Sequence, residues 1–395
     1  MKAGWEMKRL GDVCEVINGG TPKTGVAEYW DGRHLWITPA EMGKRQSHFV
    51  GDTERKITDF GLRNSSARML PPYSVILSSR APIGHLVINT EPMATNQGCK
   101  GLTPAKNLNY KFLYYYCVSI VDLLNSLGTG ATFKELSGSK LKEVVIPFSS
   151  LLEQQRIVAL LDDAFAAIAT AKANAEKNLK NARALFDSYL NSVFSRRGEG
   201  WVDRTLDQVC MVERGSSPRP IKDYFTTEPD GVNWIKIGDT QEGGKYVYST
   251  AQKITPKGAK QSRFVEEGDF ILTNSMSFGR PYIMKTRGYI HDGWFVLRLN
   301  NSIDTDYFYY LLSSGFVQLQ FARLAQGAIV KNISGDLVKK AVLPIPPLTQ
   351  QHDIVTKLLE LSAETQRLES IYQKKIEALD ALKKSILHQA FTGEL

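Results

Sequence analysis

The chain has 395 residues, of which 43% are hydrophobic and 23% charged, and its formal net charge is +8. This length indicates two or three domains, and this composition excludes a disordered chain. No apolar run approaches the roughly 20 residues of a membrane-spanning helix, and the first residues lack the apolar core of a secretion signal. The four cysteines lack CxxC spacing and the six histidines are scattered. We therefore expect buried, reduced thiols, no metal site and a cytoplasmic protein.

The chain repeats itself. The segments LGDVCEVINGGTPKT (10–24) and LDQVCMVERGSSPRP (206–220) share six identical positions. Other segments return in the same order: LWIT (35–38) as NWIK (233–236), SVILSSRAPIG (74–84) as DFILTNSMSFG (269–279), and GATFKELSGSKLKEVVIP (130–147) as GAIVKNISGDLVKKAVLP (327–344). The offset stays between 195 and 198 residues. A constant offset over the whole chain indicates a tandem duplication.

Each copy begins with about 150 residues of mixed character, 1–150 in the first and 199–347 in the second. Short runs rich in β-branched residues, such as SVIL, HLVI, DFIL and WFVLRL, alternate with Gly, Pro and Asn. These runs predict strands joined by turns. One helix is predicted over 112–127 and another over 306–324. The fold class expected for each segment is α+β, a mixed β-sheet with helices.

A long helix is predicted after each mixed segment, over 151–198 and 348–395. Apolar residues recur in two rows at seven-residue intervals, which is typical of a coiled-coil seam. In the first helix the seam is Val158, Leu161, Phe165, Ile168, Lys172, Ala175, Leu179, Ala182, Phe186, Tyr189 and Val193. In the second it is Ile354, Leu358, Leu361, Leu368, Tyr372, Leu379, Leu382 and Ile386, with breaks at Thr365 and Lys375. Asp162 and Asp163 are expected to face solvent or a partner.

The two seams are expected to cover each other. Only Gly198–Gly200 separate the first helix from Trp201, so that helix runs from the first mixed segment to the second. Equivalent contacts in both copies require the second helix to run back antiparallel. The prediction is a pseudo-twofold molecule: two similar domains (1–150 and 199–347) separated by two antiparallel spacer helices (151–198 and 348–395).

Two segments resemble catalytic motifs but lack their essential residues. MLPPYSV (69–75) has Leu70 where an amino-methyltransferase loop needs Asn or Asp before its prolines. GTGATFK (128–134) lacks the residue order of a phosphate-binding loop. We expect no catalytic residue, metal or cofactor site in this chain.

Basic and amide residues at loop-rich positions are the candidates for nucleic-acid contacts, because Lys and Arg neutralise phosphates and amides bond base edges. In the first copy they are Lys23, Lys44, Arg45, Arg63, Ser78, Ser79, Arg80, Asn96, Gln97 and Lys134. In the second they are Arg214, Arg219, Lys222, Lys257, Lys260, Arg263, Asn274, Arg280 and Lys331. A solvated surface side chain is the alternative for each. Trp36, Trp234 and Tyr114–Tyr116 are expected in the core.

These features together resemble the specificity (S) subunits of type I restriction–modification systems. The resemblance rests on LxxVxxxxxGxxP at the start of each copy, NQGCKGL (96–102), the entry EQQRIV (153–158) to the first helix and the closing HQAFTGEL. The second copy departs from it, with His291-Asp292-Gly293 in place of Asn96-Gln97-Gly98 and QQHDIV in place of EQQRIV.

The resemblance implies a function. The two domains would be target-recognition domains that read a split site in double-stranded DNA, and the helices would set its spacer. Two methyltransferase (M) subunits carrying S-adenosylmethionine would dock on the helices, and restriction (R) subunits using ATP and Mg would join them. Two alternatives remain open: a two-headed adaptor that binds proteins, and a self-contained methyltransferase.

Overall fold

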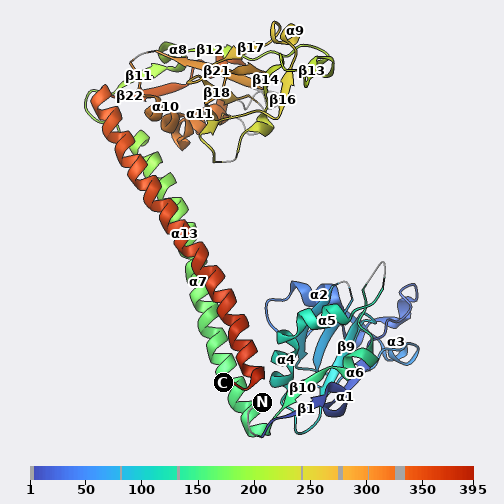
Figure 1. Ribbon diagram of the computed structural model, residues 1–395. Helices are drawn as coiled ribbons and strands as arrows, with labels where there is room; N and C mark the ends of the chain where they lie inside the picture. Colours follow the sequence, from blue (N-terminus) through green and yellow to red (C-terminus); the bar gives the residue numbers. More distant parts are fainter. Residues whose placement is uncertain are drawn as a thin grey trace. The chain divides into compact units, whose positions relative to one another are not determined.

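The computed structural model describes residues 4–80, 82–130, 134–241, 243–274, 279–300, 302–324 and 334–395. The chain forms two compact units (Figure 1). Unit 1 combines Met1–Ala175 with Lys374–Leu395, and unit 2 is Glu176–Gln373. We call residues 4–150 head 1 and residues 199–347 head 2. The units divide the chain inside the long helices, so the domain boundaries drawn at the helix starts remain a prediction.

Head 1 is built on a five-stranded sheet of order β2-β9-β6-β7-β4. Its central strand β6 is buried throughout, as a run of β-branched and apolar residues predicts. A three-stranded sheet of order β5-β3-β8 and the pair β1-β10 complete the head. The strands are β1 Glu6–Arg9, β2 Cys14–Asn18, β3 Trp30–Ile37, β4 Phe49–Val50, β5 Arg55–Ile57, β6 Val75–Ser79, β7 Ile83–Asn89, β8 Met93–Thr95, β9 Cys99–Pro104 and β10 Val145–Phe148. The helices are α1 Leu10–Val13, η1 Ala27–Tyr29, α2 Pro39–Lys44, α3 Asp59–Arg63, α4 Tyr110–Ser119, α5 Val121–Leu127 and α6 Gly138–Glu143.

Head 2 repeats this plan. Its main sheet has the order β12-β21-β18-β19-β15, its second sheet the order β13-β16-β14-β20-β17, and β11 pairs with β22. The strands are β11 Val202–Thr205, β12 Cys210–Arg214, β13 Phe225–Thr226, β14 Val232–Ile235, β15 Tyr246–Val247, β16 Gln252–Ile254, β17 Arg263–Val265, β18 Phe270–Thr273, β19 Pro281–Met284, β20 Gly288–Ile290, β21 Trp294–Leu299 and β22 Val342–Ile345. The helices are α8 Leu206–Val209, η2 Ile221–Tyr224, η3 Ile237–Asp239, α9 Pro256–Ala259, α10 Thr305–Ser313, α11 Gly315–Leu324 and α12 Gly335–Val338. The α+β class and the duplication are confirmed.

The single helix predicted in each head is in fact two. In head 1 the break lies at Ile120, between α4 and α5, where φ is −111° and ψ is 17°. In head 2 it lies at Ser314, which is extended and fully buried. Leaving the helix there lets the N–H of Gly315 donate to Oδ1 of Asn191, at 2.6 Å. A tertiary contact of this kind leaves no trace in the apolar periodicity.

The long helices begin and end where the sequence changes character. Helix α7 spans Leu151–Ser195 and helix α13 spans Leu348–Thr392. Ser150 precedes α7 and its hydroxyl accepts from the N–H of Glu153, at 3.3 Å, as an N-cap does. Two prolines precede α13, and Gly393 follows it with φ of +83°, a conformation in which glycine commonly ends helices.

The two long helices pack antiparallel in each unit (Figure 1). In unit 1 Arg156 donates to the carbonyl of Leu395, at 2.8 Å, and Lys172 pairs with Asp380, at 2.7 Å. In unit 2 Arg183 pairs with Glu369, at 3.0 Å. Residue numbers that rise along α7 meet numbers that fall along α13, so the predicted direction is confirmed.

The predicted seam is correct for α7 and needs two changes in α13. Every predicted α7 position is buried or half-buried. In α13 Leu382 is 47% exposed, and Lys383 lies over the Phe165 ring instead, 5.1 Å from its centroid. Thr365, expected to interrupt the seam, is buried, because its hydroxyl donates to the carbonyl of Leu361, at 2.9 Å. Ile376 is half-buried beside exposed Lys375, so the seam steps by four residues from Leu368 to Tyr372 and by four again to Ile376. Two such steps in succession locally unwind a coiled coil.

The residues expected in the core are there. Trp36, Trp234, Tyr115 and Tyr116 are buried and Tyr114 is half-buried. All four cysteines are buried, and burial raises the pKa of the Cys14 and Cys99 thiols to about 12. Along the described ranges, no helix combines the length and apolar character needed to span a membrane.

Candidate nucleic-acid interface

A three-residue loop occupies the same place in both heads. In head 1 the loop Asn96–Gly98 joins β8 to β9, and in head 2 the loop His291–Gly293 joins β20 to β21. Oδ1 of Asn96 accepts from the N–H of Gly98, at 2.8 Å, and Nδ1 of His291 accepts from the N–H of Gly293, at 2.8 Å. Different side chains thus make the same bond, so the loop geometry is conserved between the copies.

Two further strands end beside each loop. After β2 and β12, the N–H of Gly19 donates to the carbonyl of Cys99, at 3.1 Å, and that of Gly215 to the carbonyl of Trp294, at 2.8 Å. A Cβ atom on Gly19 would lie 1.9 Å from the carbonyl oxygen of Asn96, and one on Gly215 would lie 2.0 Å from that of His291. This close approach explains the glycine that both copies share.

The ends of β6 and β18 complete the cluster. The N–H of Ser79 donates to the carbonyl of Gly98, at 2.7 Å, and that of Asn274 to the carbonyl of Gly293, at 2.8 Å. In head 1 the segment after residue 133 joins them, because the N–H of Leu136 donates to the carbonyl of Ser79, at 2.9 Å. Segments from four parts of the chain therefore meet around loop 96–98. We call loop 96–98 with Gly19, Thr21, Ser79, Arg80 and 134–136 the loop cluster of head 1. The loop cluster of head 2 is loop 291–293 with 214–219 and Asn274.

In head 1 an acidic side chain holds two cations at this place. Glu135 pairs with Arg80, at 3.6 Å, and with Lys100, at 3.7 Å. Lys100 is only 5% exposed, so its ammonium depends on this carboxylate. Nδ2 of Asn96 donates to the hydroxyl of Thr21, at 2.9 Å, and Gln97 at the loop tip is exposed.

In head 2 the acidic residue belongs to the loop itself. The carboxylate of Asp292 accepts from Arg219, at 3.1 Å, and from Ser217, at 2.8 Å, while its carbonyl accepts from Nε of Arg214, at 3.4 Å. Partial burial raises the pKa of Asp292, but the Ser217 hydrogen bond and the Arg219 charge outweigh it, so the pKa lies below its usual value. Burial lowers the pKa of His291, which favours the neutral ring that accepts from Gly293.

The structure brings some predicted residues together and disperses the rest. Arg80, Asn96, Gln97 and exposed Lys134 gather in head 1, and Arg214, Arg219 and Asn274 gather in head 2. The remaining exposed candidates lie on other elements: Lys44 ends α2 and pairs with Glu54, Arg63 ends α3, Lys222 is in η2, and Lys257 and Lys260 lie in and after α9. Arg263 pairs with Glu213 and also donates to the carbonyl of Arg214, at 3.5 Å, so it adjoins the residues gathered in head 2. Lys23 is exposed two residues after Thr21, and Arg280 opens onto a cleft with Tyr309. Lys331 lies outside the described residues.

Three predicted contacts do not agree with the structure because their side chains are buried, and a fourth, Arg45, is bonded within the head. Ser78 and Ser79 are fully buried, and Ser78 accepts from the N–H of His85, at 2.8 Å, within the sheet. Asn274 is 1% exposed and donates to the carbonyl of Asp292, at 3.3 Å, so it supports the loop from beneath. Arg45 donates to Glu41 and to the carbonyl of Asp52, both at 2.5 Å. Ser78, Ser79 and Asn274 are therefore enclosed by the fold, and Arg45 is half-buried with its guanidinium already bonded within head 1.

Sequence reasoning missed Lys100, Glu135 and Asp292. A lysine inside the otherwise apolar strand β9 was a usable signal, since a buried cation requires a nearby anion. Alignment of the two copies already placed Asp292 at the position that Gln97 has in the first copy. Glu135 carried no such signal, because its partners Arg80 and Lys100 lie 35 or more residues away in the sequence and meet it only in the folded head.

Comparisons with known proteins now add to this geometry. The family described as the type I restriction modification DNA specificity domain matches residues 2–181 and 198–378. The type I restriction enzyme MjaIX specificity subunit of Methanocaldococcus jannaschii is 27% identical and matches over 99% of this chain and 93% of its own length. The EcoR124I/EcoR124II specificity subunit of Escherichia coli is 31% identical over 164 residues, 40% of either chain.

Solved structures share the fold. A chain from a structural study of complex assembly and conformational transition in the type I R-M system has a TM-score of 0.80 at 19% identity and covers 100% of this chain. The HsdS subunit from Thermoanaerobacter tengcongensis has a TM-score of 0.67 at 20% identity, again over 100% of this chain. The family match covers both copies of the repeat and most of the sequence. This chain therefore belongs to the specificity subunits of type I restriction–modification systems.

Proposed function

We propose that each head reads one half of a split site in double-stranded DNA through its loop cluster. The supporting observation is that both heads present a loop at the same place in the fold, with the same backbone bonds but different polar tips. The same backbone geometry with different side chains at the loop tip, Gln97 in head 1 and Asp292 in head 2, suits two domains that recognise different base sequences. Arg80 and Gln97 in head 1, and Arg214 and Arg219 in head 2, would contact base edges.

The exposed lysines would contact phosphates. Lys23 and Lys134 in head 1 lie one or two residues from members of the loop cluster. Lys222, Lys257 and Lys260 in head 2, with Lys44 and Arg63 in head 1, would position the duplex from farther away. Phosphate contacts fix orientation without carrying sequence information.

The helix pair would dock the partner subunits. Large apolar side chains remain exposed on the helices: Leu152, Leu160 and Leu185 on α7, and Leu359, Ile371 and Leu382 on α13. Exposed apolar side chains such as these are groups that a bound protein surface would cover. We propose that two M subunits, carrying S-adenosylmethionine, bind there and that R subunits with ATP and Mg join through them. This chain would select the DNA sequence, and its long helices would set the length of the spacer between the two half-sites.

An assembly experiment tests the reading function. The chain is co-expressed with its methyltransferase partner, and methylated adenines are mapped in host DNA. Duplexes carrying the mapped site are then titrated with the complex. Arg80→Ala and Arg219→Ala should each weaken binding by about 5- to 150-fold for the half-site that their head reads, as expected for a lost base contact of about 1–3 kcal/mol.

A head exchange gives the sharper outcome. Replacing residues 1–150 with an unrelated head should change one half of the methylated site and leave the other half intact. Unchanged methylation after this exchange would refute the proposal. A complex that retains no salt-sensitive affinity for any duplex would favour the protein-binding adaptor instead.

A further inference from the structure

The junction between head 1 and its helix pair contains an acidic side chain that was expected to face solvent or a partner. Asp162 of α7 instead accepts from Nζ of Lys111, at 2.6 Å, and from the hydroxyl of Tyr115, at 2.5 Å. Both donors lie on α4. The Tyr115 ring also meets Phe165 of α7 edge-on, with centroids 5.4 Å apart. One carboxylate thus ties the long helix to the head by two directional, charge-assisted bonds, one of which is also an ion pair.

A glutamine bond that occurs in both units shows which residues of unit 2 are equivalent to Asp162 and its partners. Oε1 of Gln154 on α7 accepts from the N–H of Asn109, at 2.8 Å, and Oε1 of Gln351 on α13 accepts from the N–H of Asp304, also at 2.8 Å. Counting onward from these anchors, Asp162 corresponds to Leu359 and Phe165 to Ser362. On the head, Lys111 corresponds to Asp306 and Tyr115 to Tyr310.

Unit 2 does not make the tie. Leu359 has no carboxylate and is 46% exposed. The charge on the head helix is reversed, and Asp306 forms its ion pair with Lys245. Lys245 precedes β15 as His48 precedes β4, so this ion pair lies within head 2 and does not reach the long helices. The lysine is further held over the rings of Tyr309 and Tyr310, at 4.9 and 5.2 Å.

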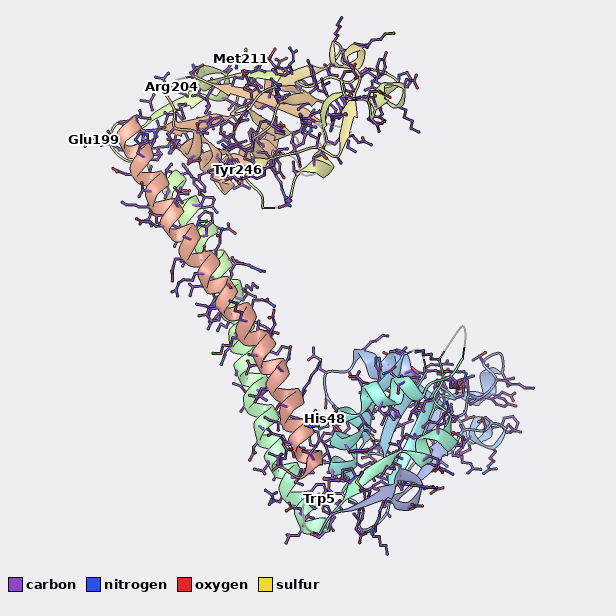
Figure 2. The ribbon with its side chains drawn as sticks, viewed as in Figure 1. Trp5, His48, Glu199, Arg204, Met211 and Tyr246 are labelled. Carbon is purple, nitrogen blue, oxygen red and sulfur yellow. The ribbon has the colours of Figure 1, made fainter. Side chains whose placement is uncertain are left out.

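A cleft of about 1160 Å³ lies at this junction in unit 2. Tyr246 and Tyr310 line it from the head, Phe186 from α7, and Ser362 and Thr365 from α13. Figure 2 shows Tyr246 on the face of head 2 that is turned toward the helix pair. Ser362 is much smaller than its counterpart Phe165, so α13 supplies no ring here, and the ring that meets the head tyrosine edge-on is Phe186 of α7, 6.1 Å from Tyr310.

Other contacts still hold head 2 on its helices. Besides the Gln351 bond, the indole of Trp201 donates to Gln350, at 3.0 Å, and Gly315 donates to Asn191. Leu190 and Phe194 of α7, with Val355 and Leu358 of α13, also pack into the core of head 2 at the end of the helix pair. These contacts anchor the head without filling the cleft. A head anchored beside an open cleft can tilt into it, whereas the two bonds to Asp162 resist such a tilt in unit 1.

We propose that Asp162 is a positioning residue that fixes the angle of head 1 on its helix pair, and that head 2, which lacks this tie, changes its angle by closing on the cleft. Taken with the proposed function, head 1 sets the register on DNA and head 2 adjusts to its half-site. The tie itself concerns the chain without DNA and does not depend on that role.

Distance distributions within each unit test the proposal on the full chain. Spin labels on introduced cysteines at Asn64 and Ala169 report unit 1, and labels at Asp230 and Lys180 report unit 2. All four positions are exposed, and the native cysteines are buried. Wild type should give a narrow distribution in unit 1 and a broad one in unit 2. Equal widths would overturn the proposal.

Reciprocal variants assign the effect to Asp162. Asp162→Asn should broaden the unit 1 distribution toward that of unit 2, while the matched control Asp163→Asn, at an exposed neighbouring position, should not. The charge exchange Lys111→Asp with Asp162→Lys should restore the narrow distribution. A folded Asp162→Asn chain with an unchanged distribution would contradict the assignment.

The tie can also be transplanted into unit 2. Lys245→His, Asp306→Lys, Leu359→Asp and Ser362→Phe together install the unit 1 residues at the equivalent positions. This variant should narrow the unit 2 distribution and leave unit 1 unchanged. Because no DNA is present, failure here leaves the DNA-reading proposal standing, and loss of DNA binding in other variants does not alter these distances.

Discussion

The two heads differ in where they keep their acidic group. In head 1 the carboxylate comes from Glu135, on a segment that crosses the loop, and the loop tip is the neutral Gln97. In head 2 the loop tip is Asp292, and the residue aligned with Glu135 is Asn332. Backbone bonds, glycines and strand order are shared. Duplication has thus preserved the framework that holds the loop and has changed the charges that the loop presents.

The largest effect should come from breaking the shared framework. Gly19→Ala and Gly215→Ala each place a Cβ about 2 Å from a carbonyl oxygen of the loop, at 1.9 and 2.0 Å respectively. We expect each to destabilise its own head by about 1–3 kcal/mol, the usual cost of overpacking a tight site. Urea titration measures the loss in the free energy of unfolding, and hydrogen exchange assigns that loss to one head.

Matched glycines provide the control. Gly25 and Gly238 have no atom within 4 Å of an added Cβ, so Gly25→Ala and Gly238→Ala should be close to neutral. Equal losses at the control and loop glycines would show that the close approach does not hold the loop.

Removing the acidic group should affect each head through different cations. Glu135→Gln leaves buried Lys100 without its carboxylate and releases Arg80. Asp292→Asn releases only Arg219, which is 80% exposed. We expect Glu135→Gln to lower the stability of head 1 by about 1–2 kcal/mol, since it leaves buried Lys100 unpaired but removes a carboxylate that is 43% exposed, and Asp292→Asn to cost head 2 less than about 1 kcal/mol.

Thermal unfolding of the two variants measures this difference. Both should relax sequence discrimination at the half-site of their own head. A larger stability loss for Asp292→Asn than for Glu135→Gln would reverse our account of the two clusters.

The loops should also differ in their response to pH. Burial lowers the pKa of His291 below its ordinary value, so the unfolded chain takes up a proton at a higher pH than the folded chain. The contribution of the neutral ring to stability is full above the ordinary histidine pKa of about 6.5 and is lost as the pH falls below it.

His291→Asn tests this directly, because Asn96 makes the same bond in head 1. The variant should be less sensitive than wild type to lowering the pH from about 7.5 to 5.5. Hydrogen exchange at Gly293 over this range measures the effect. An identical pH profile in wild type and variant would show that the ring does not control the loop.

The smallest effect should come from a phosphate contact. Lys134→Ala should weaken binding to all duplexes alike and lower the slope of affinity against salt by about 1. Titrations at several salt concentrations test this. A change confined to one sequence would mean that Lys134 contacts a base.

Much of the fold follows from the sequence because the relevant signals are local or repeated. The seam from Val158 to Val193 is a regular pattern. Because the chain is duplicated, most elements could be predicted from two copies of the same pattern. The interruption at Ser314 was not predictable, since it depends on the tertiary contact between Gly315 and Asn191. At the candidate site, composition identified Arg80, Asn96 and Arg219, but it also selected buried Ser78 and Ser79. Whether a strand-end serine faces the sheet or the solvent depends on a register that a single sequence does not reveal.

The buried glutamines at the helix entries bear on how such chains recombine. The side-chain amide of Gln154 donates to the carbonyls of Asn107 and Ser149, at 3.1 and 2.9 Å, and accepts from Asn109. Gln351 likewise donates to the carbonyl of Pro346, at 2.9 Å. A genetic crossover that falls between a head and its glutamine would still rejoin compatible parts whenever the incoming helix also begins with this amide. This amide is thus the polar contact that both heads share, and each head adds contacts of its own, such as the two bonds to Asp162 in head 1 and the Trp201–Gln350 bond in head 2.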